Sequence, residues 1–251
     1  MALLTFAQAI QNASMTELAS QELEEARIRA AYAHRPLGAR RYSAFDPGSL
    51  VANYEIETAV LKLLRRYGRT ELASQRILDV GCGDGQWLRR MLEWGARPDH
   101  LTGIDLLPDR IAAARWLCPA DVQLVCGSAC QLPHSDATFD LIFQFTVFTS
   151  ILDFEVKQHL AHEMFRVLRS DGIIVWLDYH VSNPANHEAR GIGKREIIRL
   201  FPDCGVRLHR IMLAPPLSRL LARYSMIACM LLGKIPLLCT HYLGSIQKGL
   251  R

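Results

Sequence analysis

The chain of 251 residues lacks the features that mark membrane-spanning and secreted proteins. Its longest apolar run, Tyr224 to Leu232, is about half of the roughly 18 residues that a membrane-spanning helix needs. The N-terminus has a short apolar start but no basic segment before it, which argues against a secretory signal. These absences predict a cytoplasmic protein.

The seven cysteines form no CxxC pair, and no set of cysteines and histidines has the spacing of a zinc site. We therefore expect scattered reduced thiols and no bound metal. Internal repeats and low-complexity tracts are also lacking. The net charge of +4 permits an anionic partner without requiring one.

Half of the residues are apolar, which in a chain of this length suffices for one α/β core with additions at both ends. Short apolar runs alternate with segments of helical periodicity, which predicts a parallel sheet with helices on both faces. With two further strands near the C-terminus, the expected fold is a Rossmann-like, mostly parallel sheet of seven strands. The expected strands are residues 76–80, 101–105, 122–126, 139–145, 173–179, 206–213 and 241–247, and the expected helices are residues 15–33, 49–67, 86–94, 108–116, 154–169, 194–200 and 215–232.

The strongest functional signal is ILDVGCGDG at residues 77–85, where a strand ends in a glycine cluster. Glycines let the backbone approach a ligand, and the next helix offers free amides. Asp105 ends the following strand, where a carboxylate can accept hydrogen bonds from both hydroxyls of a ribose. Dinucleotide-binding loops require glycine at the position of Gln86, and Asp79 beneath the loop would repel a pyrophosphate but attract an ammonium. The loop therefore favours a nucleoside joined to an amino acid, as in S-adenosylmethionine.

Four segments together resemble class I S-adenosylmethionine-dependent methyltransferases. LDVGCGDG (78–85) is similar to the first motif of that family and LTGIDLLPDRIAAAR (101–115) to the second. CGSACQLPHSDATFDLIFQF (126–145) and FRVLRSDGIIVWLDY (165–179) are similar to the later motifs. The nearest likeness is to the small-molecule subgroup that includes type 11 and ubiquinone-biosynthesis-like enzymes. The resemblance implies S-adenosylmethionine as the cofactor.

By position, the resemblance implies cofactor-binding roles for the glycine loop and for the strand ends that follow. Asp79 and the loop would hold the methionine part, Asp105 the ribose, and Leu106 one face of the adenine. Ser128 stands where the family usually has aspartate, and a hydroxyl is a weaker acceptor than a carboxylate. Cys82 is expected to pack inside the loop. The complete set is Asp79, Gly81, Cys82, Gly83, Gly85, Asp105, Leu106, Ser128, Ala129, Gln144 and Thr146.

Methyl transfer from a sulfonium is an in-line displacement, in which holding donor and acceptor at reacting distance contributes about 7–11 kcal/mol. An oxygen acceptor also benefits from a general base beyond the carboxyl ends of strands four or five. There the sequence reads Asp178-Tyr179-His180, followed by His187. We expect His180 as the base because histidine titrates near neutrality, with His187 and Tyr179 as further candidates. The alternative is that His180 or Tyr179 only closes the loop by hydrogen bonding.

No acidic residue follows Asp203, whereas seven basic residues do. Apolar residues recur at helical spacing from Leu217 to Leu231, which predicts a basic amphipathic helix as a cap at about residues 214–233. One interpretation is that residues 207–234 contact an anionic membrane peripherally, at the inner membrane, and that the acceptor is lipid-linked. The other is that this helix packs on its own domain or in a homodimer, with its arginines in solvent.

Residues 1–70 are expected to form a helical lid on a methyltransferase domain of residues 71–251. Residues 40–45 would fold over the cofactor and exclude water from the sulfonium. Tyr42 or Phe45 would lie against the cation, with ordinary packing as the alternative.

The expected reaction is O-methylation of a small molecule, a sugar or a lipid-linked glycan in a bacterial biosynthetic pathway. The alternatives are N- or C-methylation of a secondary metabolite or quinone, and a non-catalytic protein that binds S-adenosylmethionine. Gln86 disfavours a nicotinamide dehydrogenase, and Gln144-Phe145-Thr146 stands where an aminopropyl transferase has paired acids. Amino-methylating nucleic-acid enzymes carry a Pro-Pro-aromatic motif at the place of QFTVF (144–148), so no nucleic acid partner is expected.

Overall fold

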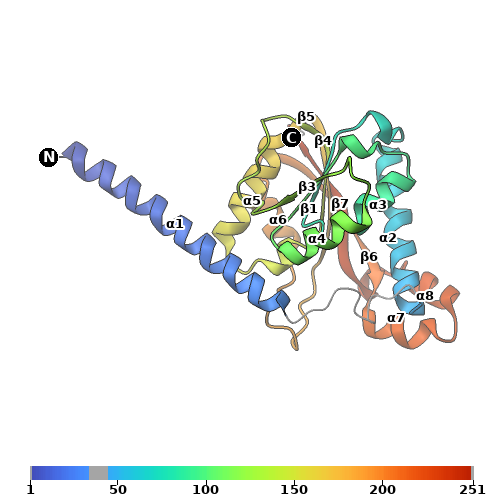
Figure 1. The fold of residues 1–251 in the computed structure, drawn as a ribbon. Coiled ribbons are helices and arrows are strands. Elements are labelled where there is room, and N and C mark those ends of the chain that lie inside the picture. The colour runs from blue at the N-terminus through green and yellow to red at the C-terminus, as the bar shows by residue number, and fades with distance from the viewer. Residues whose placement is uncertain (1, 34–44, 250–251) are drawn as a thin grey trace.

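The computed structural model describes residues 2–33 and 45–249, with side chains described from Leu18 onward. Its centre is a seven-stranded sheet with helices on both faces (Figure 1). The strands are β1 (Ile77–Val80), β2 (Leu101–Asp105), β3 (Gln123–Cys126), β4 (Phe139–Phe145), β5 (Leu168–Tyr179), β6 (Cys204–Leu213) and β7 (Cys239–Lys248). The α-helices are α1 (Ala2–Ala33), α2 (Pro47–Arg66), α3 (Gln86–Glu93), α4 (Pro108–Leu117), α5 (Phe154–Val167), α6 (Lys194–Leu200), α7 (Pro215–Ala222) and α8 (Met226–Leu232).

The strand order is β3-β2-β1-β4-β5-β7-β6, and β1 to β5 pair in parallel. Strand β7 is antiparallel to both of its neighbours, β5 and β6. The predicted fold class, a Rossmann-like and mostly parallel sheet of seven strands, is confirmed. The chain reverses its direction across the sheet between β1 and β4, and open α/β sheets bind ligands beyond the carboxyl ends of the strands at such a point.

Two apolar layers hold the helices against the sheet. Ile77 of β1 contributes to the layer beneath α2 and α3, whereas the next residue, Leu78, contributes to the layer beneath α5 and α6. Both faces of the central strands are therefore buried, as parallel sheets require. Asp46 begins α2 and Asp153 begins α5, because each carboxylate accepts backbone hydrogen bonds from the first turn of its helix.

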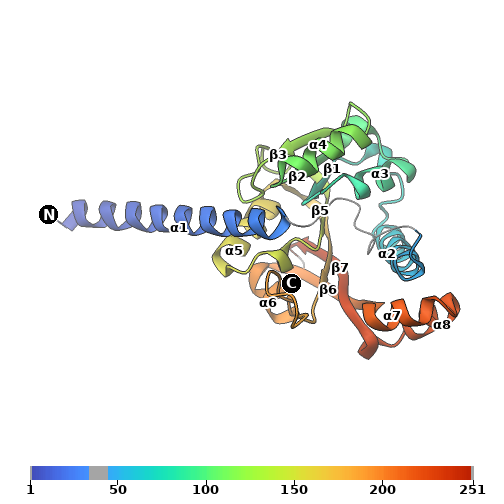
Figure 2. The ribbon, with the colours of Figure 1, turned by 60° about the horizontal axis from the view of Figure 1, so that its bottom comes forward.

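The segment between β6 and β7 differs from the single helix that was expected over residues 215–232. It forms two helices, α7 and α8, because the Ser225 side chain accepts a hydrogen bond from the Ala228 amide at 3.1 Å and so starts a new helix. Both helices lie beside α2, on the far side of the molecule from α1 (Figures 1 and 2).

Helix α1 begins well before the expected residue 15, and its N-terminal part extends away from the body of the molecule (Figures 1 and 2). Its last turns lie against the loops at the carboxyl edge of the sheet. Of residues 40–45, expected over the cofactor, 40–44 lie outside the described residues, and Phe45 is 97% exposed. No helix within the described ranges, α1 included, combines the length and apolar character that crossing a membrane requires.

We predict that Gly244→Ala in β7 lowers the free energy of unfolding by about 1–3 kcal/mol, the usual cost of overpacking. A Cβ atom at Gly244 would lie 1.9 Å from the Arg207 carbonyl oxygen of β6, so the two strands would have to separate. Urea unfolding measures the change. Gly127→Ala is the control, because a Cβ there has no atom within 4 Å; equal stability of the two variants would contradict the prediction.

Candidate functional site

Three glycines after β1 adopt the left-handed backbone conformation that favours glycine. The φ angles of Gly81, Gly83 and Gly85 are +70°, +55° and +77°. A Cβ atom would lie 2.4 Å from Val147 Cγ2 at Gly81 and 2.6 Å from Cys118 Sγ at Gly85. At Gly83 it would meet nothing within 4 Å. The loop is therefore packed on both sides and leaves its middle backbone open to a ligand.

Asp79 lies in β1 directly before this loop and is only 2% exposed. Its Oδ2 atom is buried and has no hydrogen-bond partner among the described residues. Burial, and then the nearby charge of Asp105, raise the pKa of Asp79 well above its ordinary value. A buried carboxyl group without a full set of partners is costly and calls for an explanation. A ligand that brings a positive charge to this position supplies one.

Asp105 joins the glycine loop to the loop after β2. Its Oδ2 accepts a hydrogen bond from the Gly83 amide, and its Oδ1 accepts one from the Leu107 amide, both at 2.9 Å. Burial raises the pKa of this carboxyl group. Each carboxylate oxygen keeps a further lone pair, so both can still accept from the hydroxyls of a ribose.

The residues expected around the adenine lie on two loops that α1 touches. Arg29 of α1 donates to the Leu106 carbonyl oxygen at 2.6 Å. Gln21 of α1 donates to Ser128 Oγ at 3.3 Å, and Ser128 Oγ also accepts from the Cys130 amide. The sequence interpretation expected a lid here but did not identify Gln21 or Arg29. The sequence does not distinguish Gln21 and Arg29 from the other polar residues of a solvated helix. Only the contacts of α1 with these two loops do so.

Glu24 of α1 binds the segment after β4 at residues 152–153. The side chain is nearly buried, and it accepts hydrogen bonds from Arg27 and from the Leu152 amide. Burial acts to raise the pKa of Glu24, but these hydrogen bonds outweigh it and hold the pKa below the ordinary value. Arg27 in turn donates to the Ser150 carbonyl oxygen. The helix is thus attached by charge-assisted bonds rather than by apolar packing alone.

Gln144 and Thr146, expected near the methyl donor, lie at the end of β4 in different environments. Gln144 is fully buried: its Oε1 accepts from the Val147 amide at 3.1 Å, and its Nε2 donates to Asp178 Oδ2 at 3.3 Å. Thr146 has a φ of +60°, a strained conformation for a residue that is not glycine, and such strain gathers at functional sites. Gln144 therefore stabilises the turn at Thr146 through its bond to the Val147 amide. Both polar atoms of its side chain already have partners within the protein.

Asp178 is a residue that the sequence interpretation left without a role. It is fully buried and accepts hydrogen bonds from the Thr149 hydroxyl and from Gln144. Burial raises its pKa to about 7, against the lowering effect of these bonds and of Lys157. Through Gln144 and Thr149 it fixes the turn at residues 146–149, which packs on Gly81. The signal in the sequence was an acid inside an otherwise apolar strand, IIVWLDY (173–179).

The three expected catalytic residues follow the end of β5. His180 Nε2 lies 3.1 Å from the Cys239 carbonyl oxygen, and its ring lies 4.5 Å from that of Tyr242. Burial, and then Arg210, lower the pKa of His180. Tyr179 lies edge-on to a histidine ring of β7, and His187 is exposed on the following loop. The structure thus brings Tyr179 and His180 together against β7 and leaves His187 apart.

Two residues near the loop pack within the protein. Cys82 is buried against Gly103 of β2, and burial raises the pKa of its thiol, which makes it a poor nucleophile. Trp87 of α3 lies edge-on to Phe145, with 4.6 Å between the ring centroids.

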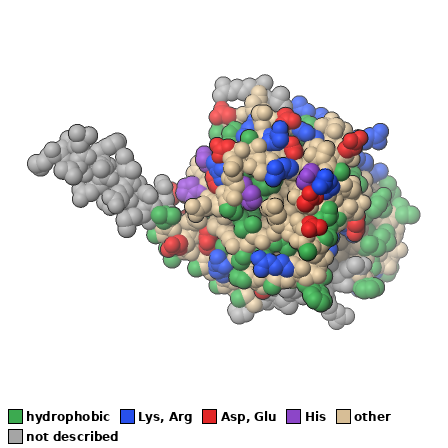
Figure 3. All heavy atoms as spheres, turned by 45° about the horizontal axis from the view of Figure 1, so that its top comes forward, with side chains coloured by type: hydrophobic (Ala, Val, Ile, Leu, Met, Phe, Trp, Pro, Cys, Tyr) green, Lys and Arg blue, Asp and Glu red, His purple; other side chains and the backbone are tan. Residues whose placement is uncertain are grey.

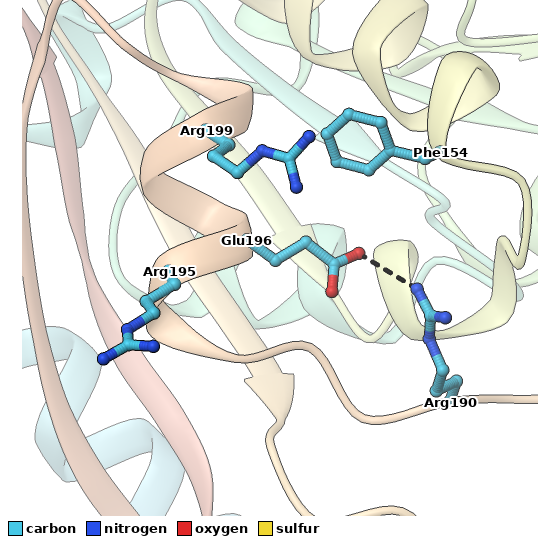
Figure 4. Close-up of a pocket in the computed structure, with 5 residues that line it drawn as sticks. All are labelled: Phe154, Arg190, Arg195, Glu196 and Arg199. Carbon is cyan, nitrogen blue, oxygen red and sulfur yellow. Dashed lines mark hydrogen bonds and ion pairs between the residues drawn. The ribbon is translucent and has the colours of Figure 1, made fainter.

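A surface pocket of about 600 Å³ lies between the start of α5 and α6 (Figure 4). Arg199 lies 4.7 Å over the ring of Phe154, and Arg190 pairs with Glu196 at 3.4 Å. Glu196 also pairs with the buried Lys157 at 2.6 Å. None of the residues that line this pocket belongs to the glycine loop or to the expected cofactor set, so it is separate from the site described above.

Comparison with known sequences identifies the central part of the chain. Residues 77–172 match the family model described as "Methyltransferase domain". The chain is 30% identical over 139 residues to the demethylmenaquinone methyltransferase of Listeria monocytogenes, covering 54% of this chain and 57% of that protein. It is 32% identical over 123 residues to the ubiquinone/menaquinone biosynthesis C-methyltransferase UbiE of Roseobacter denitrificans, covering 47% and 48%. The chain therefore spans about half the length of the curated relatives it matches.

Solved structures share the fold at low sequence identity. An S-adenosylmethionine-dependent methyltransferase of Methanosarcina mazei has a TM-score of 0.55 at 16% identity, covering 75% of this chain and 97% of that one. One of Mesorhizobium loti has a TM-score of 0.53 at 19% identity, covering 76% and 98%. The [4+2]-cyclase SpnF has a TM-score of 0.55 at 16% identity, covering 77% and 83%.

Residues 77–172 are thus a methyltransferase domain of the class I, S-adenosylmethionine-dependent kind that the motifs predicted. At the level of this domain, the predicted enzyme class and the predicted cofactor are confirmed. The unpartnered Asp79 oxygen, the open backbone at Gly83 and the free lone pairs of Asp105 fit the ammonium, the amino-acid part and the ribose of that cofactor.

We predict that Asp79→Asn changes cofactor binding and stability in opposite directions. The amide cannot pair with an ammonium, so the affinity for S-adenosylhomocysteine should fall by about 10- to 100-fold, or about 1.5–3 kcal/mol. The free energy of unfolding of the ligand-free protein should rise at neutral pH. The reason is that the raised pKa of Asp79 stabilises its protonated form in the fold, and the unfolded chain gains by releasing that proton.

Titration calorimetry and urea unfolding measure the two effects. Asp121→Asn is the control, because Asp121 is exposed and lies outside the site, and it should change neither quantity. Unaltered affinity in Asp79→Asn would remove Asp79 from the binding site.

We predict that Asp178→Asn abolishes a slope in the pH dependence of stability. The folded pKa of Asp178 is about 7, above its ordinary value of 3.8, so the unfolded chain loses the proton first and stability falls as pH rises between these values. From about pH 5 to about pH 8, the free energy of unfolding of the wild type should fall by about 2 kcal/mol relative to the variant. Urea unfolding at both pH values measures it, and parallel curves for the two proteins would show that Asp178 does not hold the proton.

Proposed function

We propose that this protein transfers a methyl group from S-adenosylmethionine to a small-molecule acceptor. The observation that carries the proposal is the pair of carboxyl groups at the ends of β1 and β2. Asp79 has a buried oxygen without a hydrogen-bond partner among the described residues. Asp105 accepts hydrogen bonds from the Gly83 and Leu107 amides, and each of its oxygens keeps a free lone pair. Asp79 lies on β1, beside β4 where the strand order reverses, and Asp105 lies one strand further, at the end of β2.

When bound, S-adenosylmethionine supplies a methyl group already activated by the sulfonium charge. Asp79 would hold the ammonium and Asp105 the ribose, while Leu106, Ser128 and the neighbouring Ala129 would bound the adenine. The strained turn at Thr146 would border the methyl donor. In this scheme the protein contributes mainly orientation, which is worth about 7–11 kcal/mol.

Helix α1 would act as the lid of this site. Its residues Gln21 and Arg29 bond to the loops that carry Ser128 and Leu106, and Glu24 anchors it to the segment after β4. A lid in this position would exclude water from the sulfonium during transfer.

For the acceptor we propose a hydroxyl group of a small molecule, of a sugar or of a lipid-linked glycan. A specific observation supports a second candidate, a ring carbon of a quinone. The matched relatives are named demethylmenaquinone methyltransferase and ubiquinone/menaquinone biosynthesis C-methyltransferase. The proposal also includes peripheral contact with an anionic membrane through residues 207–234, which would keep the protein at the inner membrane, where lipid acceptors reside.

The experiment that tests the function has two stages. Titration calorimetry with S-adenosylhomocysteine tests the cofactor site, and methyl transfer from labelled S-adenosylmethionine is then assayed with phenols, glycosides and reduced quinones. Binding without transfer to any acceptor class would favour another use of the fold, of which the cyclase SpnF is an example among the structures of similar fold.

His180→Ala is predicted to lower turnover by about 10²- to 10⁴-fold, the usual contribution of a general base, while affinity for S-adenosylhomocysteine stays unchanged. The lowered pKa of His180 keeps its imidazole neutral at pH 7, which a base requires. Steady-state kinetics and calorimetry measure the two quantities. His162→Ala, at an exposed histidine of α5, is the control.

Two other results would reassign the base. If His187→Ala causes the loss instead, the base lies on the loop after β5. If His180→Ala keeps near-normal turnover but unfolds at lower temperature, then His180 only ties β5 to the Cys239 carbonyl group of β7.

A further inference from the structure

Exposed apolar side chains are concentrated in the segment between β6 and β7. Nineteen large apolar side chains are exposed in the described part of the chain, and nine of them lie within residues 217–237. Soluble proteins scatter such residues singly, whereas a contiguous group marks a contact surface. We call this group the apolar face; it consists of Leu217, Leu220, Tyr224, Met226, Ile227, Met230, Leu231, Ile235 and Leu237.

Helices α7 and α8 turn small residues and two leucines, Leu221 and Leu232, inward and most of their large residues outward. Ser218, Ala222 and Cys229 are buried, and the last two pack with Val51 of α2. In contrast, Ile227 is 70% and Leu237 is 85% exposed. A helix pair that served only to complete its own domain would bury the large residues, because they gain most from leaving water. The inward residues thus pack these helices on their own domain, and most of the large residues are left without a partner surface among the described residues.

The charged residues within residues 215–237 have one sign. Arg219, Arg223 and Lys234 are exposed between its apolar residues, and α7, α8 and the turn that follows contain no acid. Two carboxylates of neighbouring residues lie beside them: that of Asp46, which precedes α2 and lies close to Arg219 and Arg223, and that of Glu55 of α2, which lies beside Gly233. On the face that Figure 3 shows, acidic and basic side chains intermingle with scattered apolar ones.

We propose that the apolar face docks this protein onto the surface of an anionic lipid bilayer. Its large residues would enter the boundary between head groups and acyl chains, and its three cations would lie at the level of the lipid phosphates. Charge complementarity selects this occupant over a second copy of the chain. A two-fold dimer through the same face would set Arg219, Arg223 and Lys234 of one copy against those of the other.

Docking in this orientation leaves α1 away from the bilayer, because α7 and α8 lie on the far side of the molecule from α1 (Figures 1 and 2). The inference rests on the membrane contact included in the proposed function and names the surface that makes it. It is independent of the methyl-transfer chemistry, so contact and transfer can fail separately.

Flotation with lipid vesicles tests the proposal on the full chain. Vesicles of phosphatidylcholine with about 30 mol % phosphatidylglycerol should bind the wild type about tenfold better than pure phosphatidylcholine. Leu220→Ser with Ile227→Ser should lower the partition coefficient onto anionic vesicles at least about tenfold. Arg219→Gln with Lys234→Gln should lower it on anionic vesicles only. Trp116→Ser is the matched control, because Trp116 is 87% exposed on α4, outside the apolar face, and it should bind as the wild type does.

Circular dichroism and affinity for S-adenosylhomocysteine, unchanged in every variant, would show that losses of vesicle binding are not losses of folding. A wild type that fails to float with anionic vesicles overturns the proposal. So does an equal loss in Trp116→Ser. If light scattering instead shows a dimer that Leu220→Ser with Ile227→Ser dissociates, without vesicle binding, the apolar face is a contact between copies. Vesicle binding without affinity for S-adenosylhomocysteine would contradict the proposed methyl transfer and still support the docking surface.

Discussion

The site depends on a carboxyl group, Asp79, that is buried at the end of β1 without a full set of partners. A central strand of a parallel sheet is covered on both faces, so nothing within the fold solvates this group. The glycine loop above it is then fixed by contacts on either side, with Val147 against Gly81 and Cys118 against Gly85. The backbone at Gly83, between these contacts, remains open. The nearby Asp79 Oδ2, which has no partner among the described residues, favours a positively charged ligand there.

A second buried acid acts on the same region from β5, which is separated from β1 by β4. Asp178 of β5 receives hydrogen bonds from Gln144 and Thr149, and Gln144 in turn holds the Val147 amide. Because Val147 lies against Gly81, contiguous contacts connect Asp178 to the glycine loop. The two carboxyl groups thus differ in role. Asp79 has an oxygen left for a ligand, whereas Asp178 holds the turn at residues 146–149 beside the glycine loop.

The sequence predicts the parts of this structure that depend on local pattern. The strand-glycine-helix unit at residues 77–85, the acid that ends β2 and the alternation of strands and helices follow from spacing alone, and the structure reproduces them. The division of residues 215–232 into α7 and α8 does not follow, because it rests on a single cap at Ser225. The roles of Gln21, Arg29 and Asp178 do not follow either, because each depends on a partner more than thirty residues away in the chain or on burial. The outward direction of Ile227 and its neighbours was open for the same reason.

The proton on Asp79 has a consequence for ligand capture. Since its pKa is raised in the absence of a cation, the empty site keeps its proton to a higher pH than an exposed carboxyl group does, and a bound ammonium would favour release of that proton into solvent. Capture is then coupled to proton release, so a more alkaline medium strengthens it until Asp79 is ionised without the ligand. The enthalpy recorded during binding would accordingly depend on the ionisation heat of the buffer that takes up the proton.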